Sequence, residues 1–171
     1  MSRDMQVSDT VVIAADAHTI YDQVADPVQM SRWSPENTGA TTSAAGRTLR
    51  EGEVFDGSNK RGLARWSTEC LVTAAEPGHR FAFDVRKIGP RTPFIPGRIA
   101  SWEYTLEPTE GGTLVTETWR DHRAGWPDWA AAIFDKAATG GQLFSDFQRR
   151  NIKRTLAAMK VDFEGHVDEP R

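Results

Sequence analysis

Two alternating hairpins followed by one long amphipathic helix are the features that most constrain this chain. Residues 64–85 and 99–121 each contain two alternating apolar and polar runs around a glycine-containing turn, which predicts antiparallel hairpins. Residues 142–160 then carry a stripe of apolar side chains at helical spacing: Phe144, Phe147, Ile152, Leu156 and Met159. A sheet with one apolar face must be covered, and this helix is the only long amphipathic element available. We therefore expect an α+β fold, a curved antiparallel sheet wrapped around a long C-terminal helix.

Two short helices are expected between the first strand and the meander of hairpins. Asp16 follows a β-branched run and can accept hydrogen bonds from the first amides of a helix. Asp26 can do the same for a second helix, with Pro27 at its first position and Ser34-Pro35 at its end. Trp33 closes that second helix, where it either plugs the core or lines the mouth of a cavity.

Residue parity separates the two faces of the sheet. Counting across the turn at residues 108–113 places these pairs opposite one another: Pro108 and Thr113, Leu106 and Val115, Tyr104 and Glu117, Trp102 and Trp119, Ala100 and Asp121. In the preceding hairpin, one face holds Trp66, Thr68, Cys70, Val72, Phe81, Phe83 and Val85. These side chains either fill a core or line a hollow. The carboxylates of Glu117 and Asp121 on this face favour a hollow, because an unpaired buried carboxylate is costly.

Length and composition restrict the classes of protein. The 171 residues suit a single domain, with a core at about 7–160 and a polar tail at 161–171 that we expect to fray. The formal net charge of -3 is spread without long runs of either sign, so nucleic acid is not expected as a partner. The sequence shows no apolar stretch long enough to span a bilayer, so no stable membrane insertion is expected.

The expected location is the cytoplasm. The N-terminal residues lack the apolar core of a signal peptide, and the lone cysteine, Cys70, agrees with a reducing compartment. We expect Cys70 to be a small buried side chain. The oligomeric state stays open between a monomer and a homodimer.

Motifs for metals and cofactors are missing from the sequence. Histidines occur at His18, His79, His122 and His166, none at metal-ligand spacing with Cys or another His. The glycine-containing segment 56–62 lacks the spacing of a phosphate-binding loop and is interpreted as a hairpin turn. We expect neither a metal nor a cofactor.

Glu117 is the best candidate for an acid or base. Among Tyr104, Trp102 and Trp119, its pKa could lie near neutrality, with Tyr104 or Asp121 in support. Alternatively, Glu117 only accepts a hydrogen bond from Tyr104 or an indole, or it faces outward at a bulge. Asp121 and His122 lie at the strand end, near the expected opening.

Two segments are candidates for the rim of the opening. Residues 121–141 hold Trp126, Trp129 and Phe134 between glycines, and form either a mobile lid or an ordinary surface helix. Residues 87–98, with Phe94 and Ile95, form the opposing rim, which could also serve as a dimer contact. The side chains expected to contact a ligand are Trp33, Trp66, Thr68, Phe81, Phe83, Trp102, Tyr104, Trp119, Trp126, Trp129, Phe134, Phe144 and Phe147.

The order of motifs resembles a known family. The motifs are "DQVADPVQMSRWSPE" at 22–36, "F-x-G-x-N-x-x-G-x-x-x-W-S-T" at 55–68, "AAEPGHRFAF" at 74–83 and "W-x-Y-x-L-E-P-T-x-GGT-x-V-T-E" at 102–117. Together they resemble the polyketide cyclase/dehydrase-like branch of the START-related (SRPBCC, Bet v 1-like) superfamily, from residue 7 to residue 160. The resemblance implies a helix-grip fold with a deep apolar cavity, but it carries over no catalytic residue.

These observations lead to three hypotheses on function. The preferred one is a protein that binds a small hydrophobic molecule, such as a lipid, a polyketide or an aromatic metabolite. The second is a cyclase or dehydratase that acts on such a molecule through Glu117. The third is a protein interaction module that uses the apolar rim.

Overall fold

Seven antiparallel strands form one sheet that is closed on its concave side by a long helix. The computed structural model describes residues 4–44 and 46–165. The strands are β1 (Gln6–Ile13), β2 (Asn37–Thr41), β3 (Val54–Arg61), β4 (Ala64–Glu76), β5 (Arg80–Gly89), β6 (Ile95–Thr109) and β7 (Gly112–Asp121). Their order across the sheet is β1-β7-β6-β5-β4-β3-β2, and every neighbouring pair is antiparallel.

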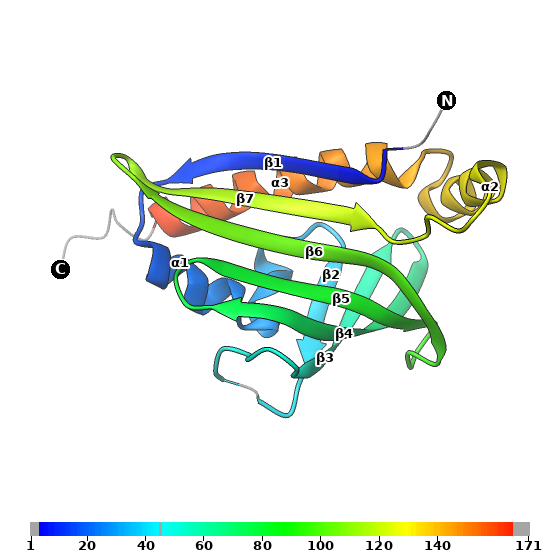
Figure 1. Cartoon of the computed structure of the whole chain (residues 1–171), viewed down its shortest axis with the longest axis horizontal. Coiled ribbons are helices and arrows are strands. Elements are labelled where there is room, and N and C mark those ends of the chain that lie inside the picture. The colour runs from blue at the N-terminus through cyan, green and yellow to red at the C-terminus, as the bar shows by residue number, and fades with distance from the viewer. Residues whose placement is uncertain (1–3, 45, 166–171) are drawn as a thin grey trace.

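The sheet curls around α3 (Phe144–Gly165), which packs along β1 and β7 (Figure 1). A second helix, α2 (Asp128–Thr139), follows β7 and projects beyond the end of the sheet (Figure 1). The polar positions of β6 and β7 face outward, where Glu103 bridges Arg80 and Arg120. This is the α+β helix-grip architecture that the apolar pattern predicted.

The two short elements after the first strand are confirmed. The carboxylate of Asp16 accepts hydrogen bonds from the amides of His18 and Thr19 at the start of α1 (Ala17–Val24). Asp26 accepts from the amide of Val28 at the start of η1 (Pro27–Arg32), which is a 3₁₀-helix. Trp33 follows η1 directly, so this corner fixes the position of its side chain.

The predicted register of the last hairpin is confirmed. Pro108 pairs with Thr113, Leu106 with Val115, Tyr104 with Glu117, Trp102 with Trp119 and Ala100 with Asp121. The register was predictable because a short glycine-containing turn at residues 110–111 joins the two strands directly. One face of this hairpin therefore points its aromatic side chains toward α3.

Two boundaries differ from the prediction. Residues 56–61 continue strand β3, and the turn comes only at Gly62, whose φ of 57° is left-handed. Helix α3 continues to Gly165, beyond the start of the predicted frayed tail, because Asp162, Phe163 and Glu164 all make contacts with the body of the protein. Residues 166–171, with His166, lie outside the described part of the chain.

Candidate ligand-binding cavity

A cavity of about 370 Å³ lies between the concave face of the sheet and α3. Its lining comes from η1, from strands β2 to β7 and from both later helices. Only four lining residues are exposed, and all lie at one end of the molecule: Ala64, Arg65, Phe134 and Ala138. We call this end, formed by the β3–β4 turn and α2, the mouth of the cavity.

Aromatic side chains make up much of the wall. Four of the six tryptophans line the cavity: Trp33, Trp66, Trp102 and Trp119. Trp102 stacks on Phe83, with ring centroids 5.9 Å apart and planes inclined by 11°. Ala100 also lines the cavity, two residues before Trp102 on β6, and its side chain is small. This surface suits a largely apolar molecule with flat or flexible groups.

Most residues predicted to contact a ligand do line the cavity: Trp33, Trp66, Thr68, Phe83, Trp102, Tyr104, Trp119, Phe134 and Phe144. Phe81, Trp126, Trp129 and Phe147 do not. Phe81 packs edge-on against Tyr21 of α1, which fills the end of the sheet opposite the mouth. Trp129 points to solvent from α2, and Trp126 rests edge-on against Phe134. The ring of Phe147 is covered by Arg61, whose guanidinium carbon lies 3.9 Å from the ring centroid.

Glu117 lies in the wall as a buried carboxyl with one free oxygen. The hydroxyl of Tyr104 donates to Glu117 Oε1 over 3.1 Å, and Glu117 Oε2 has no partner among the described residues. Burial raises the pKa of Glu117 to about 8, against the lowering effect of the Tyr104 hydrogen bond. Burial, together with the neighbouring carboxylate, also raises the pKa of Tyr104. At neutral pH, Glu117 is therefore mostly a protonated acid that can donate into the cavity.

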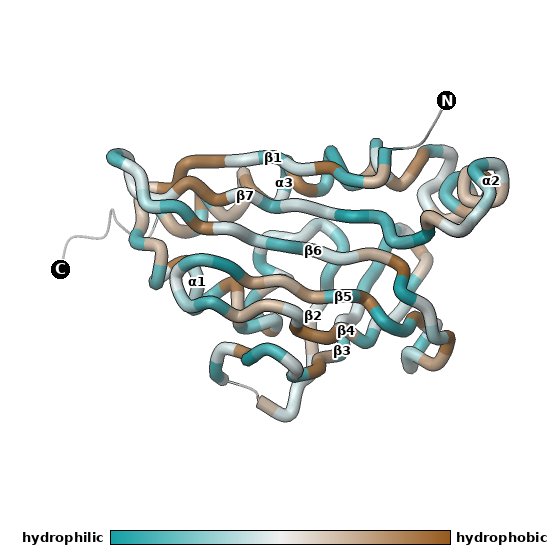
Figure 2. Tube along the Cα trace, viewed as in Figure 1, coloured by the Kyte–Doolittle hydropathy of each residue, from teal (hydrophilic) through white to brown (hydrophobic). Residues whose placement is uncertain are grey.

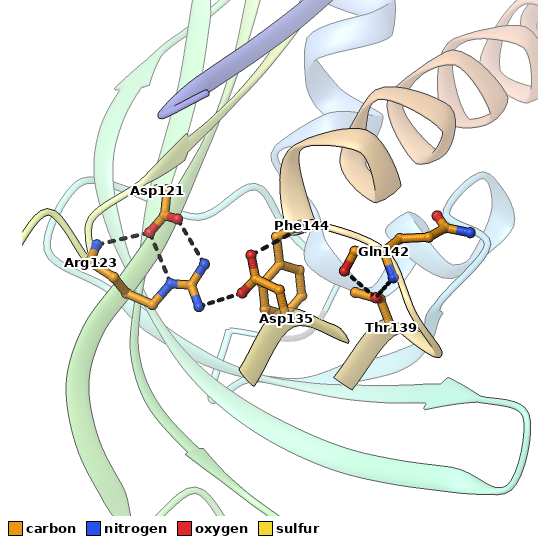
Figure 3. A network of polar contacts seen from close by, with 6 residues as sticks. All are labelled: Asp121, Arg123, Asp135, Thr139, Gln142 and Phe144. Atoms are coloured by element: carbon orange, nitrogen blue, oxygen red, sulfur yellow. Dashed lines mark hydrogen bonds and ion pairs between the residues drawn. The ribbon is translucent and has the colours of Figure 1, made fainter. Parts of the chain in front are cut away.

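Asp121 belongs to a different network, so its predicted support of Glu117 is corrected. It lies four residues along β7 from Glu117, about 13 Å away at the usual rise of a strand. Its two oxygens accept from Nε and Nη2 of Arg123 over 3.0 and 2.7 Å. Arg123 also donates to Asp135 of α2 over 2.7 Å, and Asp135 accepts from the amide of Phe144 at the start of α3 (Figure 3). This buried cluster ties β7, α2 and α3 together.

A second polar cluster lies near the mouth. Arg61 Nε donates to Glu36 Oε1 over 2.7 Å, and Asn151 of α3 donates to Glu36 Oε2 over 3.0 Å. Burial raises the pKa of Glu36, although Arg61 and Asn151 oppose that change. The guanidinium of Arg61 also lies near the ring of Trp66 and bonds to the carbonyl of Ala138 in α2.

Sequence reasoning missed the second cluster, although a signal was present. Residues Phe55, Gly57, Asn59 and Arg61 alternate along β3, and all four line the cavity. A run this rich in polar residues and glycine predicts a turn. In the folded protein it is a strand, and its polar side chains have partners beside the cavity, as Arg61 has in Glu36.

Trp33 is both a wall of the cavity and an anchor of the corner. Its indole N–H donates to Asp162 of α3 over 2.8 Å, and its ring packs against Phe163 at 5.6 Å. The same carboxylate pairs with Arg32. The side chain is only 5% exposed and packs on Asp162 and Phe163, near the end of α3 that lies away from α2, so Trp33 anchors the corner and lines the cavity wall but does not lie at the mouth.

The contacts of His122 and Cys70, the two remaining candidates, do not point to a catalytic role. The imidazole of His122 bonds to Ser101 on the convex face, and burial, together with Arg98, lowers its pKa. Cys70 is buried in the cavity wall, and burial raises its pKa to about 12, so it is a poor nucleophile. Within the described chain, no group of three His, Cys, Asp or Glu side chains lies close enough to hold a metal ion.

A family profile described as polyketide cyclase / dehydrase and lipid transport matches residues 4–164. The chain belongs to this polyketide cyclase/dehydrase and lipid transport family. The resemblance inferred from the motif order is thereby confirmed. Membership in the family indicates binding of a hydrophobic ligand, which agrees with the aromatic wall of the cavity. No curated protein matches the sequence.

Several solved structures of other proteins share the fold. A polyketide-cyclase-like protein of Corynebacterium glutamicum is 24% identical, with a TM-score of 0.58 over 99% of this chain and 100% of that one. A START superfamily protein of Mycobacterium smegmatis is 15% identical, with a TM-score of 0.64 over 94% and 98%. A protein of Nitrosomonas europaea is 10% identical, with a TM-score of 0.67 over 99% and 100%. At these identities, the likeness concerns the fold alone.

Among its described residues, this family member contains no helix long and apolar enough to cross a membrane.

Proposed function

We propose that the protein binds a small, largely apolar molecule, such as a lipid, a polyketide or an aromatic metabolite, in the cavity between sheet and α3. The observation that carries the proposal is an aromatic hollow of about 370 Å³ whose exposed lining residues, among those that the structure describes, lie together at one end. A core that served only stability would be filled by side chains, since protein interiors pack to the density of organic crystals. The membership in a lipid transport family supports the same function.

The tryptophans provide the readout for a test. Because Trp33, Trp66, Trp102 and Trp119 line the cavity, a bound ligand should change the intrinsic fluorescence of the protein.

Native mass spectrometry is a second test. For the purified protein, alone and after incubation with fatty acids or aromatic polyketides, we expect it to show one ligand per chain.

A pair of variants makes the test specific. Ala100→Phe places a ring in the cavity, whereas Ala157→Phe places the same ring on the exposed face of α3. Ala100→Phe should lower the affinity for the ligand at least tenfold, and Ala157→Phe should leave that affinity unchanged. Thermal unfolding of both variants shows whether they are still folded. Equal affinity in the two variants would contradict binding in this cavity.

A second candidate function is acid–base chemistry on the bound molecule. It is favoured by the free oxygen of Glu117 and by its pKa of about 8, which suit exchange of a proton with an enolisable ketone. In its ionised form, Glu117 would take a proton from the carbon next to the carbonyl, and the carboxylic acid so formed would then donate that proton to the enolate oxygen, which gives the enol and restores the carboxylate. Tyr104 would hold Glu117 in place.

The two candidate functions are separable. Exchange of the α-hydrogens of 2-tetralone for deuterium, followed by NMR, reports enolisation. If the protein is an enzyme, the variant Glu117→Gln should no longer accelerate this exchange but should keep its affinity for the ketone. If the original protein does not accelerate the deuterium exchange of 2-tetralone, ligand binding without catalysis remains the proposed function.

A further inference from the structure

Three segments meet at the mouth of the cavity. The β3–β4 turn lies between Arg61 and Ala64, and the β5–β6 hairpin runs next to it because Ser67 of β4 pairs with Gly89 of β5. Arg61 bonds to the carbonyl of Ala138, which brings α2 to the same end. Figure 1 shows α2 and the ends of β4, β5 and β6 gathered at the right side of the molecule.

Exposed large apolar side chains are concentrated on these three segments. They are Leu63 on the first, Phe94 and Ile95 on the second, and Trp126, Trp129, Ile133 and Phe134 on or beside α2. Trp129 is 71% exposed and Leu63 is fully exposed. The exposed large apolar residues elsewhere in the described chain are all valines: Val12, Val28, Val54 and Val161. Scattered single residues are ordinary, but a group around an opening marks an interaction surface. Figure 2 shows hydrophobic and hydrophilic positions next to one another at the end of the β5–β6 hairpin.

The same end carries an excess of positive charge. Residues 57–68 and 85–102 contain seven Lys or Arg and no Asp or Glu, in a chain whose net charge is -3. Glu69 pairs with Arg86 and Lys87, and Asp84 pairs with Arg98. Lys60, Arg65 and Arg91, by contrast, make no ion pair with any carboxylate in the described part of the chain. Helix α2 adds Asp128, Asp135 and Lys136; Asp135 is buried and pairs with Arg123, and the charges of the exposed Asp128 and Lys136 cancel.

We propose that the mouth of the cavity docks on the surface of an anionic lipid bilayer. Tryptophan, leucine and phenylalanine side chains enter the interfacial layer, while lysine and arginine interact with anionic headgroups. Because the exposed lining residues lie at the same end, the docked cavity opens toward the bilayer. The docking surface is the set Lys60, Leu63, Arg65, Arg91, Phe94, Ile95, Trp129 and Ile133.

Two other partners fit these observations less well. A second copy of the chain, joined by a two-fold axis, would place Lys60, Arg65 and Arg91 against the same cations of its partner. An acidic protein would satisfy the charges, but the apolar side chains project from the tips of three separate segments instead of lining a groove. A bilayer accepts such projecting side chains without a matching shape.

Flotation with lipid vesicles tests the proposal without any knowledge of the cavity ligand. The protein should bind phosphatidylcholine vesicles that contain phosphatidylserine, bind pure phosphatidylcholine weakly, and dissociate as salt is raised. The double variant Leu63→Ser, Trp129→Ser removes two exposed apolar side chains and should lower vesicle binding by about tenfold or more. The charge reversals Lys60→Glu and Arg91→Glu should lower it by a similar factor.

Matched changes far from the mouth serve as controls. Val161→Ser and Arg154→Glu alter exposed residues of α3 and should leave vesicle binding unchanged. Absence of binding to the anionic vesicles would overturn the proposal, and so would equal losses in the control variants. A dimer in sedimentation that the Leu63→Ser, Trp129→Ser pair dissolves, without vesicle binding, would assign the surface to a second copy instead. The cavity variant Ala100→Phe should still bind vesicles, so failure of ligand binding and failure of docking remain distinguishable.

Discussion

The hydroxyl of Tyr104 and the carboxyl of Glu117 form a buried pair at 3.1 Å, directly opposite one another on β6 and β7. The pair leaves Glu117 Oε2 facing a cavity without a partner among the described residues. A side chain placed in this way costs stability once it is ionised. Its cost is therefore measurable as a dependence of stability on pH.

Glu117→Gln should remove the part of the pH dependence of stability that lies between about pH 4.5 and pH 8. The pKa of Glu117 is about 8 in the folded protein and near 4.5 in the unfolded chain, so only the unfolded chain releases the proton between these values. Stability then falls by about 1.4 kcal/mol for each pH unit in this window, and the fall ends above pH 8. Below pH 4.5, both states hold the proton and the group contributes nothing. Urea unfolding of both proteins at pH 5, 7 and 9 measures the difference, and parallel curves would contradict the raised pKa.

Tyr104→Phe should raise the pKa of Glu117 above about 8. The variant keeps the ring but removes the hydroxyl that donates to Glu117 Oε1, and this hydrogen bond favours the charged form of the carboxyl. An NMR titration of the Glu117 side-chain carboxyl in both proteins measures the change. Tyr21→Phe is the control, because Tyr21 packs at the opposite end of the sheet. A pKa that falls in Tyr104→Phe would show that the hydroxyl does not donate to Glu117.

Asp135→Ala should destabilise the protein by about 3 kcal/mol. Asp135 is 2% exposed, and it pairs with Arg123 and accepts from the amide of Phe144, so both groups would lose a buried partner. Asp128→Ala, at the exposed start of the same helix, should cost less than about 1 kcal/mol. Chemical unfolding of the two variants measures the difference, and equal values would show that the cluster does not tie α2 to β7.

Trp33→Phe should destabilise the protein by about 1 kcal/mol. The phenyl ring can still pack on Phe163, but the hydrogen bond from the indole to Asp162 is lost. The exposed Trp129→Phe is the matched control and should change the free energy of unfolding little. If Trp33→Phe were as stable as the original protein, the hydrogen bond from Trp33 to Asp162 would not contribute to stability.

Parity made one half of the cavity predictable, because each side chain of a strand has only two faces to choose from. The pairs from Ala100 with Asp121 to Leu106 with Val115 follow from a single turn. Parity gives a face, however, and not a position along the hollow. Phe81 and Phe83 share a face, but α1 packs on Phe81 and only Phe83 reaches the cavity.

The polar clusters were not predictable because their members come from distant segments. Glu36, Arg61 and Asn151 meet only after the sheet has curled around α3. Asp121 and Asp135 belong to different elements, and they share Arg123 only because the chain turns a corner between β7 and α2. Local periodicity contains no information on such encounters, although charged residues on an otherwise apolar face indicate that partners must exist.

The wall formed by α3 differs from the other walls in its attachments. Neighbouring strands are joined by ladders of backbone hydrogen bonds, whereas α3 is held through side chains such as Asp135, Glu36 and Trp33. A packed helix can shift by about 1–2 Å while its side chains adjust. The cavity can therefore widen or narrow without the breaking of any strand pair. Ligands of different thickness would be accommodated by the movement of one helix.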